Sequence, residues 1–356
     1  MGKLAELEKI KKAVDRELER FFSHAAKEAY KSDKLSGEVV EYLGVLALSG
    51  GKRLRPALLL SAYEAAGGQN KKAALKAAGA LELVHLYLLI HDDVIDHGTV
   101  RHGQMSVHER FAQRATRIFG KGRDAHFGAS VAIVGGDLLY AGAVEMMLAA
   151  KEDPNTAVSA VEELQRIVRT TCIGQVQDIA IEREKKVTSR RVLEMYANKT
   201  AKYTFQGPLR LGLMLAGNGD ARLAKALDEY ALKMGIAFQI RDDIIGVFGN
   251  SRTTGKGVGM DIAEGKKTLM VLEALKKATL AQKRRINALL GKRDLSWKEV
   301  REFQNIMVAT GALARAQNKV EKLSEEAKEE IAKNKMPTSV KSFLGSLADH
   351  LKERHK

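Results

Sequence analysis

The sequence predicts an all-α protein, and three observations support this prediction. Apolar residues recur at helical spacing along most of the 356 residues, whereas almost no stretch alternates as a strand would. Alanine, leucine, lysine and glutamate dominate the composition, and only four prolines occur. No stretch rich in proline, glycine and serine divides the chain, so we expect a single domain over residues 1–356.

The composition also limits the class of protein. The single cysteine, Cys172, excludes an intramolecular disulfide and suits a reducing compartment. The N-terminal segment has no apolar signal core, and no run reaches about 18 uninterrupted apolar residues. We therefore expect a cytoplasmic protein without a transmembrane segment.

The formal net charge of +15 fits nucleic acid, anionic lipid or polyphosphate partners. The basic residues are dispersed among glutamates, and aromatic residues make up only 5% of the chain, so a nucleic-acid partner is not expected. A weak contact with an anionic membrane surface stays open.

Two helices and a basic loop are predicted at the start of the chain. An amphipathic helix is expected over residues 3–31 and a second helix over 37–49. The loop SGGKRLRP follows, and its proline suits the first turn of the next helix. Positive side chains and free backbone N–H groups at a helix start can bind an anion, although a solvated basic loop fits the same residues. The basic residues there are Lys52, Arg53 and Arg55.

The next helix, predicted over residues 73–96, ends in three carboxylates. Its run LELVHLYLLI is apolar on nearly every side, so we expect it in the core. Asp92 and Asp96 are four residues apart and share a face, whereas Asp93 lies off that face. If Gly98 ends the helix, the acids lie at the negative end of its dipole. Either a multivalent cation or Arg and Lys side chains must compensate, unless the acids are hydrated at the surface.

A second apolar helix, over residues 230–250, repeats this design. Asp242 and Asp243 lie near its end, and Gly246 is among the residues expected to stop it. The two acidic clusters could face each other across a cavity. Carboxylates without nearby Cys or paired His ligands suit Mg²⁺ or Mn²⁺ better than zinc, and such magnesium commonly accompanies a phosphorylated substrate.

Other polar residues interrupt apolar helical patterns between and after these clusters. We expect Asp137 to make a buried structural hydrogen bond, and Gln175 and Asp178 to share one face of a helix over 157–185. A glycine-rich loop around Lys256 could close over phosphate. Two or three amphipathic helices are predicted over residues 281–355.

In combination these segments resemble the trans-isoprenyl diphosphate synthases, also called the polyprenyl synthetase family. The resemblance covers nearly the whole chain from residue 51. It depends on motifs that occur in a fixed order: GKRLRP, DDVID followed by TVRHG, GQVQD, NKT, FQIRDD and DIAEGKKT. It implies a helical bundle of the isoprenoid synthase type around a central cavity, usually assembled as a homodimer.

The resemblance also implies a role for each motif residue. Asp92, Asp96 and Asp242 would be ligands of Mg²⁺ ions, three in number and replaceable by Mn²⁺, that hold an allylic diphosphate. The neighbouring Asp93 and Asp243 belong to the same catalytic motifs. Further contacts with the allylic diphosphate are implied for Arg101, Gln175, Asp178, Lys199, Lys256 and Lys266. Isopentenyl diphosphate would contact Gly51, Lys52, Arg55, His85 and His102.

The implied reaction is ionisation, condensation and elimination. Mg²⁺, lysine and arginine stabilise the charge on the departing diphosphate in a closed, dry site, and the isopentenyl double bond attacks the allylic cation. Oxygens of Thr200 and Gln239 would point toward that cation. No protein nucleophile is needed, which fits the absence of a Ser/His/Asp or Cys/His pattern.

Product length is expected to depend on Tyr87, five residues before Asp92, with Leu88 beside it. A large residue at that place resembles the short-chain synthases that stop at the C20 product. We therefore expect geranylgeranyl diphosphate, with farnesyl diphosphate as the alternative.

The sequence departs from the family pattern at two positions. His102 stands where the family usually has a second arginine, and Gly246 stands where many members have a third aspartate, as in archaeal members that carry glycine. A non-catalytic regulatory subunit is therefore an alternative. A di-iron carboxylate protein is not favoured, because convincing Glu-x-x-His pairs are absent. A terpene cyclase would share the ionisation chemistry, but the basic GKRLRP loop suits a second diphosphate substrate.

Overall fold

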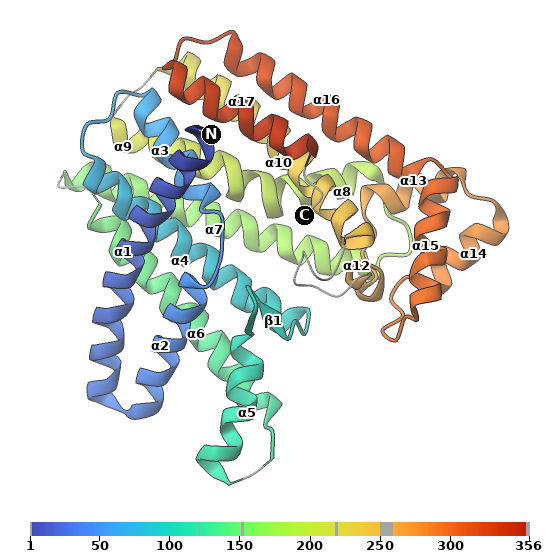
Figure 1. Cartoon of the computed structure of the whole chain (residues 1–356), viewed down its shortest axis with the longest axis horizontal. Coiled ribbons are helices and arrows are strands. Elements are labelled where there is room, and N and C mark those ends of the chain that lie inside the picture. The colour runs from blue at the N-terminus through green and yellow to red at the C-terminus, as the bar shows by residue number, and fades with distance from the viewer. Residues whose placement is uncertain (1, 121, 151–152, 218–219, 250–258, 354–356) are drawn as a thin grey trace. The chain divides into compact units, whose positions relative to one another are not determined.

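The computed structural model describes residues 2–120, 122–150, 153–217, 220–249 and 259–353 (Figure 1). The chain forms two compact units, one of Met1–Leu164 with Leu211–Asn218 and the other of Gln165–Arg210 with Gly219–Lys356. The all-α prediction is confirmed, since the only strands in the described part are two antiparallel strands of two residues each. The prediction of a single domain stays a prediction.

The first unit is built on α4, which runs from Lys71 to Ile95. Its N-cap is Asn70, whose side chain accepts a hydrogen bond from the backbone N–H of Ala73. Its alanines and leucines are buried, and it packs against α6, α3 and α1. The other elements of this unit are α1 Gly2–Ser32, α2 Lys34–Leu48, α3 Leu54–Ala65, β1 Val100–Arg101, β2 Gln104–Met105, α5 Val107–Phe119, α6 Ala125–Leu148 and the first part of α7 Pro154–Arg183.

A buried ion-pair network joins three of these helices to the basic loop. Arg53, at the N-cap of α3, donates to Asp15 of α1 at 2.7 Å, to Glu82 of α4 at 2.7 Å and to the carbonyl of Ala47 in α2 at 2.6 Å. Its side chain is 4% exposed. A guanidinium with five donors can satisfy several acceptors at once, so one side chain fixes the start of α3.

Among the residues that the structure describes, two helices are long and apolar enough to cross a membrane, judged by length and composition alone. They are α4 and α6, and the apolar windows in them are 67% and 39% buried in the structure. The window in α6 is less buried because one face of that helix is exposed, with Ile133, Val134 and Leu148 among its side chains. The prediction for Asp137 is wrong for the same reason: this residue lies on the exposed face of α6, and its side chain is 68% exposed.

The second unit is built on α10, Ala221–Phe248, which packs against α16 and against a π-helix, η1, of residues Ala197–Gln206. Gly235 permits the approach to η1, because a Cβ there would collide with Ala201. Four helices lie in the described residues after 279, one or two more than predicted. The other elements are the end of α7, α8 Ser189–Tyr196, the first four residues of α9 Gly207–Ala216, whose remaining residues belong to the first unit, α12 Met260–Glu264, α13 Leu269–Lys277, α14 Leu280–Leu289, α15 Trp297–Ala309, α16 Ala312–Ala332 and α17 Thr338–Glu353.

Candidate active site

The first acidic motif lies at the C-terminal end of α4. Asp96 is the C-cap residue, and its backbone N–H donates to the carbonyl of Asp92 at 2.8 Å. Asp93 is 4% exposed, and Arg101 of β1 donates to both of its carboxylate oxygens. Gly98 lies against the same carboxylate, because a Cβ there would be 2.8 Å from its Oδ1. The sequence predicted that a cation would compensate the acids at the end of this helix. For Asp93 that cation is the guanidinium of Arg101.

This pairing divides the three carboxylates into two kinds. Asp93 points into the protein and is held by Arg101, whereas Asp92 and Asp96 are partly exposed. Burial lowers the pKa of Arg101, but the hydrogen bond with Asp93 and the charges of Asp92 and Asp96 outweigh it, so the pKa is raised overall. Arg101 is thus a permanent cation beside the partly exposed pair, which can bind a metal ion.

The basic loop is held in place by the network around Arg53. Arg53 is buried and donates hydrogen bonds to Asp15 and Glu82. Its neighbours are more accessible to solvent, since Lys52 is exposed and Arg55 is partly exposed. Of the three basic residues considered for anion binding, the structure therefore assigns Arg53 to the fold. Lys52 and Arg55 have the access that an anionic ligand requires.

His102 comes to this loop through the hairpin of β1 and β2. His102 and Gly103 both have positive φ, 52° and 75°, which is the conformation of a type I′ turn. The turn presses the imidazole against Gly50, where a Cβ would be 2.7 Å from its Cγ and Nδ1. Burial and the positive charges of Arg101 and Arg53 lower the pKa of His102.

His85 of α4 belongs to the same basic group. Burial, together with the charges of Arg55, His102, Arg101 and Arg53, holds the pKa of His85 well below 6.5. The two histidines and Arg55 therefore lie close enough to influence one another electrostatically. They form a largely basic surface in which both imidazoles are neutral near pH 7.

The second acidic motif, in α10, has the same internal design as the first. Asp243 is 4% exposed and accepts hydrogen bonds from Tyr196 and, at 2.9 Å, from Gln239 Nε2. Burial and the charge of Asp261 raise the pKa of Asp243 well above its usual value, although both hydrogen bonds act in the opposite direction. Asp242, like Asp92, is the partly exposed member of its motif.

The chain of hydrogen bonds continues from Gln239 to the π-helix. Thr200 Oγ1 donates to Gln239 Oε1 at 2.5 Å. Because the Nε2 of Gln239 donates to Asp243, the orientation of its amide is determined, with the oxygen on the side of Thr200. Tyr196 in turn accepts from the backbone N–H of Leu269 at 3.0 Å. The Oγ1 of Thr200 and the Oε1 of Gln239 therefore lie next to each other, and hydrogen bonds through Asp243 and Tyr196 hold Gln239 in place.

The predicted cations of this unit are each paired with an acid. Lys199 donates to Asp178 at 2.6 Å, and Lys266 lies 2.7 Å from Glu264. Gly174 makes the pairing of Lys199 with Asp178 possible. A Cβ at Gly174 would collide with the backbone of Lys199 and push α7 and η1 apart. Gln175 lies on the same helix and is partly exposed. Lys256 lies outside the described residues.

A magnesium ion fits these carboxylates on chemical grounds. The partly exposed acids supply oxygen ligands, and the buried member of each motif is already held by protein donors. No group of three or more His, Cys, Asp or Glu residues in the described part of the chain could enclose a metal by itself. The arrangement is typical of Mg²⁺ that is held by one or two carboxylates and shared with substrate phosphates.

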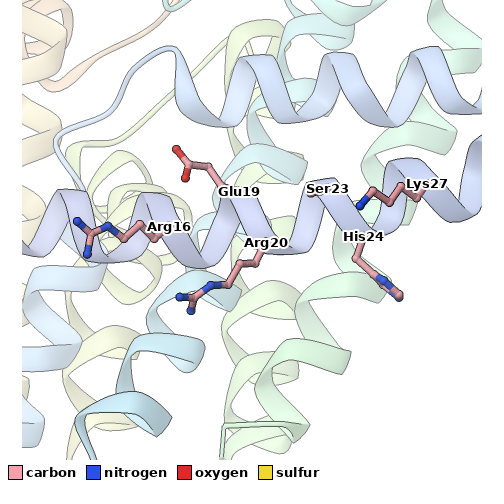
Figure 2. Close-up of a pocket in the computed structure, with 6 residues that line it drawn as sticks. All are labelled: Arg16, Glu19, Arg20, Ser23, His24 and Lys27. Atoms are coloured by element: carbon pink, nitrogen blue, oxygen red, sulfur yellow. The ribbon is translucent and has the colours of Figure 1, made fainter.

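A hollow on the surface of the first unit has no connection with these motifs. Its lining residues, shown in Figure 2, all belong to α1 and include three basic side chains and one acid. They are Arg16, Glu19, Arg20, Ser23, His24 and Lys27.

Comparison with known proteins identifies the family. The model of the polyprenyl synthetase family matches residues 37–307. The chain belongs to the polyprenyl synthetase family. This match runs through both compact units, so each acidic motif lies within it.

Relatives and solved structures of the polyprenyl synthetases agree with this result. Geranylgeranyl diphosphate synthase of Methanosarcina mazei is 33% identical over 283 residues, which are 80% of each chain. Geranylfarnesyl diphosphate synthase of Aeropyrum pernix is 32% identical over 91% of this chain and 95% of its own. The crystal structure of a geranylgeranyl pyrophosphate synthase from Corynebacterium glutamicum, complexed with isoprenyl diphosphate and magnesium, has a TM-score of 0.92 at 31% identity and covers 98% of this chain and 99% of its own.

The residue expected to set product length in this polyprenyl synthetase faces α6. The ring centroid of Tyr87 lies 4.8 Å from that of His91 and 5.4 Å from that of Tyr140. Leu88 is partly exposed beside it. Sequence reasoning missed Tyr140, because spacing within one helix carries no information about which residue of another helix packs there.

Three other residues near the motifs were not given their roles from the sequence, for different reasons. Tyr196 precedes the NKT motif, and nothing in the local sequence marked it as a hydrogen-bonding residue. In the structure its hydroxyl donates a hydrogen bond to Asp243. Lys267 follows Lys266 in the sequence but caps the end of α7, donating to the carbonyls of Ile181, Glu182 and Glu184. Asp261 was visible as the first residue of the DIAEGKKT motif, but its position against α10 was not.

We predict that His85 makes the fold less stable in mild acid. Its native pKa lies well below 6.5, so as the pH falls through 6.5 the unfolded chain takes up a proton that the native state does not. The His85→Gln variant should therefore lose roughly 1 kcal/mol less free energy of unfolding than the native protein between pH 7.5 and 5.5. Urea denaturation at several pH values measures this.

The matched control is His24→Gln, because His24 is exposed on α1. Its pH dependence should equal that of the native protein. An identical pH dependence in the His85→Gln variant would contradict the neutral native state of His85.

Proposed function

We propose that this polyprenyl synthetase is a Mg²⁺-dependent trans-prenyltransferase that joins isopentenyl diphosphate to an allylic diphosphate and makes geranylgeranyl diphosphate. The observation that supports it best is the shared design of the two acidic motifs. Each has a buried carboxylate held by protein donors beside a partly exposed one. Several relatives of similar identity are named geranylgeranyl diphosphate synthases.

The carboxylates that would hold Mg²⁺ are Asp92, Asp96 and Asp242. Bound Mg²⁺ supplies Lewis-acid stabilisation of the charge that develops on the departing diphosphate. We propose three ions, with Mn²⁺ able to replace them. Arg101 and the donors around Asp243 keep Asp93 and Asp243 inside the protein, so these two residues orient the metal-binding pairs rather than bind the ions.

The cations proposed for the allylic diphosphate are held in position before any substrate arrives. Lys199 is fixed by Asp178, Lys266 by Glu264 and Arg101 by Asp93. Donors that are already oriented do not have to reorganise as charge develops on the leaving group. Gln175 and Lys256 complete this proposed set.

The isopentenyl side is formed by the basic loop and the hairpin. Lys52 and Arg55 supply charge, Gly51 supplies backbone N–H without a side chain, and His85 and His102 supply imidazole donors. Since the imidazoles lie against this basic loop, an anion there would favour their protonation. The histidine at position 102 is thereby compatible with binding of a diphosphate.

The oxygens of Thr200 and Gln239 are proposed to stabilise the allylic cation. Their mutual hydrogen bond fixes both oxygens, and the support through Asp243 and Tyr196 prevents them from turning away. A fixed dipole stabilises a cation more than one that must first reorient.

We predict that the purified protein with Mg²⁺, labelled isopentenyl diphosphate and C5, C10 or C15 allylic diphosphates forms a C20 product that EDTA abolishes. Dephosphorylation and separation by chain length measure this. The Asp92→Asn variant should lose most of the activity, because it removes a ligand of the ion. A C15 end product would favour the farnesyl alternative, and no extension from any starter would favour a non-catalytic regulatory subunit.

We predict that Tyr87→Ala lengthens the product by at least one C5 unit. Removal of the ring opens space between α4 and Tyr140 into which a longer chain can extend. Product length is the appropriate measurement, because relatives of this chain at 32–33% identity carry names with different products. The control is Tyr30→Ala, at an exposed tyrosine of α1. An unchanged C20 product from the Tyr87 variant would contradict this assignment.

We also propose that two copies of the chain form a homodimer through the exposed face of α6. This face carries three exposed apolar side chains beside Asp137: Val134 is 65% exposed, and Ile133 and Leu148 are each 46% exposed. Exposed apolar side chains gathered on one helix face are typical of a protein interface. Gly135 and Gly136, by contrast, belong to the buried side of the same helix.

We predict that Val134→Glu converts the dimer into a monomer, because it places an unpaired charge in the apolar contact. Sedimentation equilibrium measures the mass in solution. Val308→Glu is the matched control, since Val308 is a comparably exposed valine of α15. A Val134 variant that keeps the dimer mass would place the interface elsewhere.

Three broader proposals accompany this function. We propose that both compact units act as one domain, because the family match includes both.

We propose a cytoplasmic location, in keeping with water-soluble diphosphate substrates. The basic side chains along α1 support a weak contact with anionic lipid, but not a spanning segment (Figure 2).

A further inference from the structure

The basic loop between α2 and α3 is folded around a side chain of its own. Arg53 and Gly51 both have left-handed backbone conformations, with φ of 51° and 91°. The guanidinium of Arg53 turns back to Gly51, where a Cβ would lie 3.1 Å from its Nη1. Lys52 lies between these two residues in the chain. The course of the loop at Lys52 therefore depends on where this guanidinium is held.

The conformation of Arg53 requires support from other elements. A left-handed backbone is unfavourable for a residue with a side chain, and it persists only where surrounding contacts determine it. Arg53 is the N-cap residue of α3, but its side chain makes no capping hydrogen bond there. The guanidinium instead donates to Asp15, to Glu82 and to the carbonyl of Ala47. These acceptors hold the residue in its unfavourable conformation.

One of the acceptors comes from outside the region that the family model matches. Asp15 belongs to α1, whereas the match begins at residue 37. Its Oδ1 accepts from Nε of Arg53 at 2.7 Å and also lies 2.7 Å from Nη2. The side chain of Asp15 is 16% exposed, so this ion pair is largely shielded from water. The first helix thus supplies a charged partner to the basic loop.

The other acid joins the same network to the helix that carries His85. Glu82 accepts from Nη1 of Arg53 at 2.7 Å, and its side chain is 5% exposed. His85 follows three residues later and lies on the same face of α4. Burial is the main cause of the lowered pKa of His85 and of His102, and the charge of Arg53 contributes to both shifts. The guanidinium is therefore close to both imidazoles as well as to the loop.

We propose that Asp15 is a positioning residue for isopentenyl diphosphate, and that it acts by holding the Arg53 guanidinium around which the basic loop is folded. This inference rests on the proposed function, in which Gly51, Lys52 and Arg55 contact that substrate. It gives α1 a role in substrate binding that does not depend on contact with the substrate.

Charge and position predict opposite effects when this carboxylate is removed. Asp15→Asn raises the net charge near the loop by one, so electrostatic attraction alone would strengthen the binding of a diphosphate. Loss of the anionic acceptor instead releases the guanidinium and lets the backbone of Arg53 relax, which displaces Lys52 and the start of α3. A displacement of about 1 Å can lower a rate by about 100-fold, whereas solvent and salt screen a distant charge. We therefore expect the positional effect to be the larger.

The test measures binding of isopentenyl diphosphate to the full chain by isothermal titration calorimetry, without an allylic substrate and without turnover. Asp15→Asn should raise the Kd by about 10-fold or more. Steady-state kinetics should show a similar rise in KM for isopentenyl diphosphate and an unchanged KM for the allylic diphosphate. Urea denaturation establishes that the variant is folded. A Kd equal to that of the native protein, or lower, overturns the proposal.

A double-mutant cycle with Arg53→Lys shows whether Asp15 acts through Arg53. Lysine keeps the positive charge but lacks the planar fork that contacts several acceptors at once, so Arg53→Lys should also weaken binding. The double variant should bind about as weakly as the weaker single variant. A loss equal to the product of the two single losses contradicts the proposal, because the residues then act independently. If Asp15→Asn does not fold, native binding by Arg53→Lys contradicts it as well.

Two control variants lie on the same helix. Glu17→Gln removes another partly buried carboxylate of α1, whose ion pair with Arg20 lies outside this network. Lys11→Gln removes the other partner of Asp15, which lies 2.6 Å from its Oδ2. Both variants should bind isopentenyl diphosphate like the native protein. If either weakens binding as much as Asp15→Asn does, the contact with Arg53 is not responsible, and the proposal is wrong.

This proposal and the proposed function can fail separately. If isopentenyl diphosphate binds and its binding depends on Asp15 but no product forms, the proposed condensation is wrong and this inference stands. If product forms and Asp15→Asn binds isopentenyl diphosphate like the native protein, only this inference is wrong. A native protein that binds no isopentenyl diphosphate contradicts both.

Discussion

Each acidic motif contains a carboxylate that is buried at the end of an apolar helix, and the local structure is organised to satisfy it. A buried carboxylate without donors is very costly, so a partner from another element is required. For Asp93 this partner is Arg101, which the hairpin brings back to the end of α4. For Asp243 the donors are Tyr196 and Gln239, from α8 and from α10 itself. Beside these held carboxylates, Asp92, Asp96 and Asp242 remain partly exposed.

Close packing at glycines is the second means by which the motif residues are positioned. Gly174 allows the backbone of Lys199 to approach α7, and Gly50 accommodates the ring of His102. At Gly246 the missing side chain leaves room for Asp261. In each case a Cβ would displace a residue that carries charge or a hydrogen bond. Each of these glycines therefore makes room for a motif residue that a larger side chain would displace.

Sequence periodicity placed several helices correctly, but it began α10 nine residues late and did not reveal what surrounds the motif residues. The first two helices and α4 lie within three residues of their predicted bounds. Asp137 was assigned to the interior because α6 is apolar on nearly all sides, and such a pattern does not show which side is covered. Arg53 was grouped with Lys52 and Arg55 as a ligand of anions, yet it is buried with Asp15 and Glu82. Its acidic partners lie 38 and 29 residues away, beyond the range of any local pattern.

The sequence by itself determined the helical class, the order of the motifs and the chemical groups available for binding a metal and a diphosphate. Only the tertiary structure decided which of two adjacent like residues faces inward. Asp92 and Asp93 in α4, and Asp242 and Asp243 in α10, are examples. The physical reason is that neighbouring residues on a helix point about 100° apart, and burial depends on which distant element packs on each side. That choice is made by contacts between segments far apart in the chain, which no local pattern records.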